Sequence, residues 1–393
     1  MLPASGFLLY YQFDMNKAYF PHLDGLRFFA FLAVLISHLS LFTGFTGYPF
    51  NIFPALFLTH GDLGVAFFFT LSGFLITYLL LQEREQQGSV SLKHFYIRRA
   101  LRIWPVYVVV ILCGFFIFPN LIDIPLALSL EAPLSRLPAY IFFLGNIDLV
   151  YMGYASVIIG VLWSLAVEEQ FYLIWPAVFK KIKLSRIPWV LGGVIIWSWI
   201  YRFAHWENYE IVHYMTLSVF SDLAIGCLLA YVAYFNKGFV TFFEKLPSWA
   251  IAINYIVISV YIVLRVVVPF MFSPTINRTL YSLESIIFCI LFSVVIMEQC
   301  FGKHSLFKMA HSHVFTYLGK ISYGLYAYHM IALTIVLWFG VVFFGLPLQY
   351  SSVISFGFIG ASTFVLSVFF AYVSYVYMEK PILKLKDRVG YVK

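Results

Sequence analysis

Long apolar runs are the feature that most constrains what this chain can fold into. A helix that crosses the hydrocarbon layer of a bilayer, roughly 30 Å thick, needs about 20 mostly apolar residues. Apolar residues make up 62% of the chain and charged residues only 11%, a balance that a soluble globule cannot bury. The sequence therefore predicts an all-α, polytopic membrane helix bundle of about ten transmembrane helices, which excludes nucleic-acid-binding proteins and secreted disulfide scaffolds. The expected spans are 25–44, 61–82, 103–119, 158–179, 187–204, 214–235, 249–272, 280–300, 321–343 and 351–378.

One further apolar segment, 138–150, is too short to cross a bilayer and contains Asn146 and Asp148. A segment of this length is typical of a re-entrant or interfacial helix. We therefore leave it out of the ten spans and expect a helix of that kind there.

Positively charged residues gather in alternate connections between the spans. Lys and Arg concentrate on the cytoplasmic side of membrane proteins. If the N-terminus is cytoplasmic, the inner segments hold 20 of the 25 Lys and Arg residues, and the outer loops hold only Arg136 and Arg278. This asymmetry predicts an even number of crossings with both termini in the cytoplasm. It divides the chain into an N-terminal tail 1–24, a membrane domain 25–378 and a basic tail 379–393.

Two polar residues share one face of the first span. Arg27 and His38 are eleven residues apart, which on a helix returns to within about 20° of the same direction, about 16 Å further along the axis. An ionisable residue in hydrocarbon costs roughly 2.5–3.5 kcal/mol on insertion scales, so each needs a reason to be there. A cation and a titratable imidazole on one stripe suit a site entered from the cytoplasm and reaching across the membrane, and we expect Arg27 and His38 to belong to one continuous cavity. Alternatively, Arg27 extends to lipid phosphate and His38 bonds a neighbouring helix.

A cluster of arginines precedes the third span, in SLKHFYIRRALRIWP. On a helix, Arg98 and Arg102 share a face and Arg99 lies at its edge. Guanidinium groups bind phosphates through charge-assisted, bidentate hydrogen bonds, so the cluster is a candidate phosphate site at the cytoplasmic mouth. Alternatively, these residues serve only to set the orientation of the chain.

Carboxylates fall near the middle of the fourth span, in WSLAVEEQFYLIWP. Glu168 and Glu169 point about 100° apart on a helix, so at most one of them faces a given cavity well. Buried carboxylates at this depth either form a polar site or join helices to one another. Asp222 and His329, in later spans, suit a structural role as well as a functional one.

Other signals are sparse. Arg265 and Glu284, in neighbouring spans, are candidates for an interhelical ion pair. The four cysteines show no CxxC spacing, so neither a disulfide framework nor a zinc site is indicated. P-loop, HExxH and GxSxG motifs are missing from the sequence, and the chemistry that each of them carries is therefore not indicated.

Seven motifs follow one another along nearly the whole chain: LDGLR with His38 beyond it, FFFTLSGFLI, FYIRRALRIWPVY, WSLAVEEQFYLIWP, SDLAIGCLLAY, GKISYGLYAYHM and YMEKPILKLK. Each is weak alone, but together they resemble the acyltransferase-3 family of membrane-bound acyltransferases. One position departs from the family pattern. Many relatives carry Asp in the second-span motif where this chain has Ala66, with Asp62 four residues earlier.

The resemblance implies transfer of an acyl group, commonly acetyl from acetyl-CoA, to a hydroxyl of a cell-surface or lipid-linked carbohydrate. The donor is cytoplasmic and polyanionic, which gives Arg98, Arg99 and Arg102 a ligand. The implied partners are acyl-CoA, a carbohydrate or lipid-linked glycan, and the lipid bilayer, without nucleic acid. The implied location is the bacterial cytoplasmic membrane.

Catalytic roles follow from the same resemblance. His38 would remove the proton of the acceptor hydroxyl or itself carry the acyl group. Arg27 would orient the donor or stabilise developing negative charge. Glu168 would fix the tautomer of His38 or bind acceptor hydroxyls. This chemistry needs no metal.

Two other classes of protein use similar features. A transporter or flippase of a glycan or lipid-linked precursor would use the polar stripe as a pathway, and a discontinuous segment such as 138–150 would suit it. A glycan polymerase would need large outer loops, and only 120–157 is long. The polymerase therefore ranks last.

Overall fold

The computed structural model describes residues 20–44, 61–121, 132–271, 273–344 and 353–385. Within these residues the chain is helical throughout, and ten helical segments are long and apolar enough to cross a membrane. Each overlaps one of the ten predicted spans, so the predicted fold class is confirmed. Of the predicted tails, residues 1–19 and 386–393 lie outside the described residues; the first helix begins at Pro21, inside the predicted tail 1–24.

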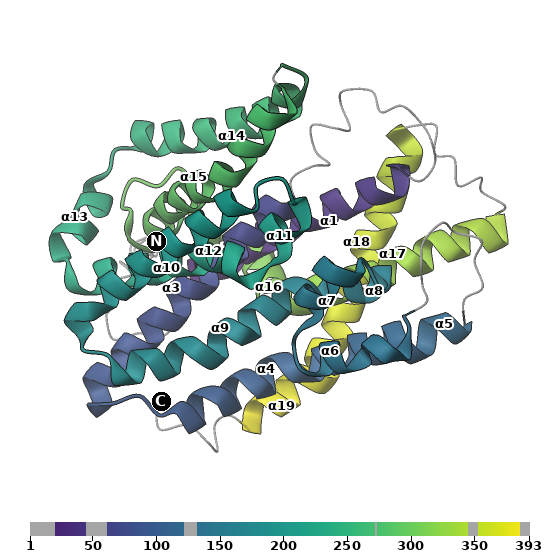
Figure 1. Cartoon of the computed structure of the whole chain (residues 1–393), viewed down its shortest axis with the longest axis horizontal. Helices are drawn as coiled ribbons and strands as arrows, with labels where there is room; N and C mark the ends of the chain where they lie inside the picture. The colour runs from purple at the N-terminus through teal and green to yellow at the C-terminus, as the bar shows by residue number, and fades with distance from the viewer. Residues whose placement is uncertain (1–19, 45–60, 122–131, 272, 345–352, 386–393) are drawn as a thin grey trace, which may run out of the picture.

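The helices run roughly side by side along the long axis of the molecule (Figure 1). The long helices are α1 (Pro21–Gly44), α3 (Gly61–Gln87), α4 (Leu92–Leu112), α9 (Leu162–Lys181), α10 (Ile187–Ala204), α12 (Thr216–Phe235), α14 (Ser248–Met271), α15 (Pro274–Phe301), α17 (Ser322–Phe344) and α18 (Val353–Ser374). The short ones are α5 (Phe118–Leu121), α6 (Leu137–Ile141), α7 (Gly145–Met152), α8 (Val157–Gly160), α11 (Tyr209–Tyr214), α13 (Lys237–Lys245), α16 (His313–Lys320) and α19 (Lys380–Lys384). The segment 138–150 thus forms two short helices, α6 and α7, where one was expected, and its re-entrant or interfacial placement stays a prediction.

Polar residues begin several helices at the expected places. The Ser91 hydroxyl accepts a hydrogen bond from the backbone N–H of His94 at the start of α4, and Asn236 does the same for Phe239 at the start of α13. Such caps satisfy N–H groups that have no partner inside the helix. Large apolar side chains, such as Trp189 on α10 and Ile256 on α14, project outward with 81% and 58% of their surface exposed, as expected for lipid-facing positions.

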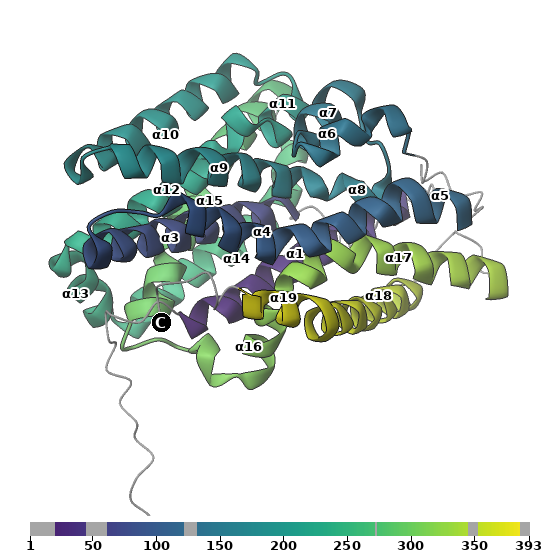
Figure 2. The ribbon, with the colours of Figure 1, turned by 90° about the horizontal axis from the view of Figure 1, so that it is seen from below.

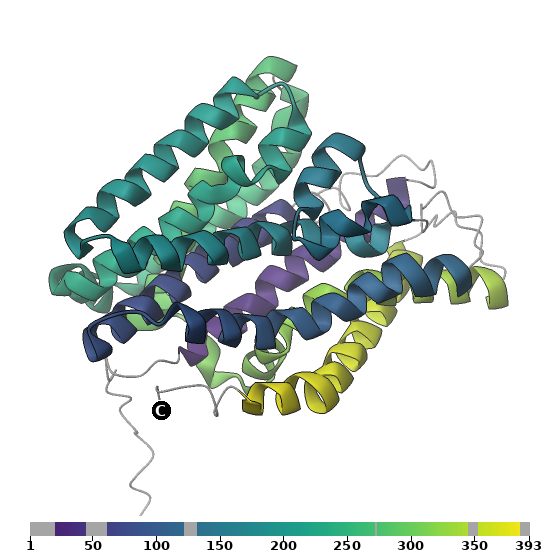
Figure 3. The ribbon, with the colours of Figure 1, turned by 60° about the horizontal axis from the view of Figure 1, so that its bottom comes forward.

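The two ends of the bundle differ in charge. The α3–α4 turn, the α9–α10 turn, α13 and α16 lie towards one end, which we call the basic end (Figures 2 and 3). These segments carry most of the Lys and Arg residues that connect the spans. The opposite end, where α5, α7 and α11 lie, we call the far end. The positive-inside rule predicts that the basic end faces the cytoplasm, and that assignment stays a prediction.

Helix α3 runs through the middle of the bundle and is buried along most of its length. It crosses α12 closely because both helices carry glycine at the contact. A Cβ atom added to Gly73 would lie 2.0 Å from the carbonyl oxygen of Leu223, and one added to Gly226 would lie 2.1 Å from that of Thr70. Small residues of this kind let transmembrane helices approach to backbone contact. The crossing holds α3 where its side chains reach into cavities on both sides.

Candidate active site

A cavity lies between α1, α3, α4, α9 and α17. It encloses about 700 Å³, its open mouth included. Three arginines and one glutamate supply its charged lining, and all four were predicted as site residues. The polar lining residues are Arg27, Ser72, Arg99, Arg102, Ser164, Glu168, Tyr172, Ser322, Tyr323 and Tyr326. We call this space the cationic cavity, because three guanidinium groups face it and only one carboxylate does.

Arg27 enters the cationic cavity from the first turns of α1. Its Nη1 donates to the Asp24 carboxylate at 2.8 Å, one turn earlier on the same helix. The Arg27 side chain keeps 21% of its surface exposed, whereas Asp24 is buried. Asp24 therefore anchors one edge of the guanidinium.

Arg99 is held in the cavity by aromatic rings. Its guanidinium lies 5.5 Å from the centroid of the Phe95 ring and 5.3 Å from that of Tyr172, within the range of cation–π contacts. Arg102, one turn further along α4, lines the same cavity and is exposed. The two side chains therefore present positive charge to a single space.

Arg98 is placed differently from its neighbours. Its Nη2 donates to Glu83 at 3.0 Å, and the same carboxylate accepts the backbone N–H of Ser91 at 2.8 Å. These two hydrogen bonds join the end of α3 to the start of α4. Because the anionic partner lies on that side of α4, Arg98 is not among the described residues that line the cationic cavity, although its helical facing resembles that of Arg102.

Of the two adjacent carboxylates on α9, Glu168 lines the cavity. It accepts a hydrogen bond of 2.7 Å from the Ser72 hydroxyl of α3. Glu169 points instead to Trp104 on α4, whose ring N–H donates to it at 3.4 Å. The 100° separation of neighbouring helix positions thus divides the pair between two surroundings.

His38 lies deeper along α1 and meets a second histidine. Its Nδ1 is 3.0 Å from the Val34 carbonyl oxygen and 3.2 Å from Nε2 of His329 on α17. Nδ1 of His329 is 2.7 Å from the carbonyl oxygen of Tyr326. A carbonyl only accepts, so both Nδ1 atoms carry protons in the neutral pair, and Nε2 of His329 accepts from His38. The Nε2 of His38 is then left with its lone pair.

The histidine pair and the cationic cavity are linked through Tyr326. This tyrosine lines the cavity, and its hydroxyl contacts the Ser164 hydroxyl at 2.6 Å. Among the described residues His38 does not itself line the cavity, so the predicted continuous cavity from Arg27 to His38 stays a prediction. Sequence reasoning did not pair His329 with His38. The two histidines lie on different helices, α1 and α17, so no residue spacing within one helix could have signalled their contact.

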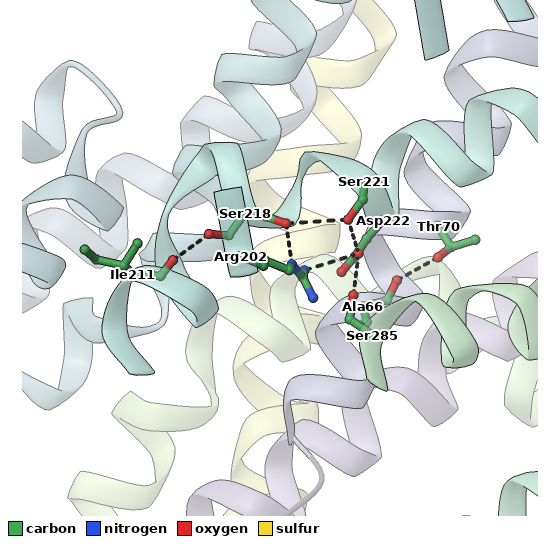
Figure 4. Close-up of polar contacts among 8 residues, drawn as sticks. All are labelled: Ala66, Thr70, Arg202, Ile211, Ser218, Ser221, Asp222 and Ser285. Carbon is green, nitrogen blue, oxygen red and sulfur yellow. Dashed lines mark hydrogen bonds and ion pairs between the residues drawn. The ribbon is translucent and has the colours of Figure 1, made fainter. Parts of the chain in front are cut away.

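A second polar cluster joins α10, α12 and α15 (Figure 4). Arg202 of α10 donates from Nε to the Ser218 carbonyl at 2.6 Å and lies 3.5 Å from Asp222 of α12. The Asp222 carboxylate also accepts from the hydroxyls of Ser221 and Ser285, at 3.0 and 2.6 Å. The predicted pair of Arg265 and Glu284 is present as well, with Nε and Oε1 2.8 Å apart. The charged side chains of this cluster are thus engaged in ion pairs.

The fold and these contacts define a polytopic membrane protein with a cation-rich cavity between its helices and a histidine pair beside it. The chain belongs to the acyltransferase-3 family, because the family model of the acyltransferase domain matches residues 20–372. The resemblance seen in the seven motifs is therefore confirmed.

Two curated relatives carry named activities. The chain is 35% identical over 236 residues to the peptidoglycan O-acetyltransferase OatA of Listeria monocytogenes serovar 1/2a, a match covering 56% of this chain and 35% of that protein. It is 30% identical over 231 residues to the O-acetyltransferase OatA of Staphylococcus aureus strain NCTC 8325, covering 55% and 35%. The chain thus aligns with about a third of the length of each. No solved structure matches it.

Proposed function

We propose that this protein is an O-acetyltransferase of the bacterial cytoplasmic membrane. It moves an acetyl group from cytoplasmic acetyl-CoA to a hydroxyl of a cell-surface or lipid-linked carbohydrate. The observation that carries the proposal is the cationic cavity, in which Arg27, Arg99 and Arg102 converge inside a membrane bundle. Three converging guanidinium groups suit a polyanionic ligand, and coenzyme A carries several phosphates.

The donor's acidic end binds at Arg99 and Arg102, the two arginines of the α4 cluster that line the cavity. Arg98 is paired with Glu83 and does not bind the donor. It affects donor binding only by stabilising the connection between α3 and α4. The long pantetheine arm then reaches past Arg27 towards Tyr326 and the histidine pair. Arg27, fixed on one edge by Asp24, points its remaining N–H groups at the thioester carbonyl oxygen as negative charge develops there.

His38 acts as the general base. The oxygen of the acceptor hydroxyl attacks the thioester carbonyl carbon, a C–O bond forms and the C–S bond breaks. The hydroxyl proton passes to Nε2 of His38, the nitrogen with the lone pair, and from there to the departing coenzyme A sulfur. His329 holds the tautomer of His38, so of the two roles expected for Glu168 we retain the binding of acceptor hydroxyls.

The transport alternative has less support. A transport pathway built on the discontinuous segment 138–150 would bring residues of α6 or α7 to the polar stripe. Among the described residues, neither helix supplies a lining residue to the cationic cavity. We therefore favour group transfer.

The proposal is tested in cells and with purified protein. Mass spectrometry of cell-surface glycans, with and without the gene, should find acetyl esters that depend on this protein. Protein reconstituted in lipid nanodiscs should release coenzyme A from acetyl-CoA when an acceptor glycan is added. If deletion of the gene left glycan acetylation unchanged and the protein carried an intact glycan across proteoliposome membranes, the transporter would be favoured over the acetyltransferase.

A further inference from the structure

A second cavity lies beside the cationic cavity, on a neighbouring face of α3. It encloses about 400 Å³, its open mouth included. Residues from α3, α9, α10, α11, α12 and α15 line it, and Trp163 and His213 form an aromatic wall with ring centroids 5.4 Å apart. We call it the outer cavity, because it is the nearer of the two to the far end. Its charged lining residues are Asp62, Arg202, Asp222 and Glu284.

The charged groups of the outer cavity are paired within the protein. Arg202 is paired with Asp222, and Arg265 of α14, outside the lining, contacts both Asp62 and Glu284. One guanidinium group and three carboxylates therefore line the outer cavity, whereas three guanidinium groups and one carboxylate line the cationic cavity. A site of this kind has no surplus cation for phosphates. It offers fixed hydrogen-bond acceptors and donors beside aromatic rings, which suits a neutral, hydroxyl-rich ring.

The two cavities share a wall. Val65 and Phe69 of α3 line both of them. On α9, Trp163 faces the outer cavity and the next residue, Ser164, faces the cationic one. Only about one turn of α3 and the neighbouring stretch of α9 thus separate the spaces, so ligands in the two cavities approach one another closely.

The general base lies at the same level. Helices α1 and α3 touch at Ser37 and Gly61, where a Cβ atom added to the glycine would lie 2.8 Å from that of Ser37. His38 and Asp62 are each the next residue along their helices. The stretch of α1 that carries His38 therefore packs against the start of α3, which carries Asp62 of the outer cavity.

We propose that the outer cavity is the acceptor subsite and binds one neutral pyranose ring of the glycan. This inference rests on the proposed function and adds where the acceptor lies. The sugar packs against Trp163, and its hydroxyls bond to the paired carboxylates around Arg202 and Glu284. The acceptor hydroxyl meets the thioester, reaching in from the cationic cavity, at the shared wall. Bonds and the proton then move as in the general-base step above.

The test separates acceptor binding from donor binding. The variants are Trp163→Phe, Glu284→Gln and the milder Ser285→Ala, with Trp189→Phe and Glu244→Gln as matched controls on exposed positions. The probes are soluble glycan fragments of unacetylated peptidoglycan and acetyl-CoA. Calorimetry in nanodiscs measures equilibrium binding of each, and coenzyme A release measures transfer. Thermal unfolding shows which variants are folded.

We expect Trp163→Phe and Glu284→Gln to weaken glycan binding about tenfold or more and Ser285→Ala severalfold, as for lost hydrogen bonds and stacking area, with acetyl-CoA binding unchanged. The controls should bind both ligands like the parent protein. A parent protein that binds no glycan fragment, or outer-cavity variants that shift only acetyl-CoA binding, would overturn the inference. Saturable glycan binding that these variants weaken, without any acetyl transfer by the parent, would uphold the subsite and refute the proposed function.

Discussion

The cationic cavity and the outer cavity lie side by side along α3 and differ in how their arginines are paired. In the cationic cavity Arg99 lies against two aromatic rings and Arg102 is exposed, whereas Arg27 forms an ion pair with Asp24. In the outer cavity Arg202 is bound by Asp222 and by a backbone carbonyl. An arginine inside a membrane is thus an anion site only where its own helices leave the guanidinium charge uncompensated.

The α4 cluster repeats this difference within five residues. Arg98 is compensated by Glu83, whereas Arg99 lies against Phe95 and Tyr172. We therefore propose that Arg98 stabilises the connection between α3 and α4 and that Arg99 belongs to the ligand site. The predictions that follow test that division.

The largest effect is expected for His38→Ala. Loss of a general base should reduce acetyl transfer by about a hundredfold or more, while binding in both cavities persists. Removing a polar group from an apolar span should not harm insertion. Coenzyme A release at saturating substrate measures the effect, and His205→Ala, at the end of α10, is the matched control. If the His38→Ala variant retained full acetyl transfer, His38 would not be the general base.

Arg99 and Arg102 should matter to the donor far more than Arg98 does. Each charge-assisted hydrogen bond is worth roughly 1.5–3 kcal/mol, so Arg99→Gln with Arg102→Gln should raise the half-saturating acetyl-CoA concentration tens-fold or more. Arg98→Gln should lower the unfolding temperature and leave that concentration nearly unchanged. Cysteine labelling of the 83–102 segment must first report the same orientation in every variant. If loss of each of the three arginines raised the half-saturating acetyl-CoA concentration equally, Arg98 would belong to the donor site like Arg99 and Arg102.

Arg27→Lys keeps the charge and removes the planar fork. If Arg27 orients the thioester, transfer should fall about tenfold, because an ammonium group cannot hold both Asp24 and the carbonyl oxygen in one plane. Simple snorkelling to lipid predicts almost no loss. The measurement is the maximal rate at saturating acetyl-CoA. The same exchange in the outer cavity, Arg202→Lys, should instead change the acceptor concentration dependence.

The smallest effect is expected for Ser72→Ala. This change removes the 2.7 Å hydrogen bond to Glu168, and a neutral donor of this kind is worth about 0.5–1.5 kcal/mol. Transfer should fall by a few-fold as Glu168 loses its fixed position. Thr77→Ala, which removes a hydroxyl bonded to Trp175 on the same two helices, serves as the control. A loss as large as that of His38→Ala would assign Glu168 a part in the chemistry itself.

The helical architecture could be predicted from the sequence because the length and hydropathy of a segment determine whether it can cross a membrane. Each predicted span is matched, and so is the pair Arg265–Glu284. Helical facing also gave the correct separation of Glu168 from Glu169. It failed to separate Arg98 from Arg102, since their difference comes from Glu83 on another helix. The contact between His38 and His329 joins residues 291 positions apart, and no periodicity within one helix reports on such a pair.

The shared wall of Val65 and Phe69 has a consequence for the cell as a whole. A passage lined by charged groups from one face of a membrane to the other would conduct protons and small ions and would collapse the membrane potential. Two apolar side chains on the most tightly packed helix of the bundle interrupt the polar lining at that point. We therefore expect the α3–α12 crossing at Gly73 and Gly226, which holds α3 in place, to limit ion leakage through the bundle as well as to set the geometry of the two cavities.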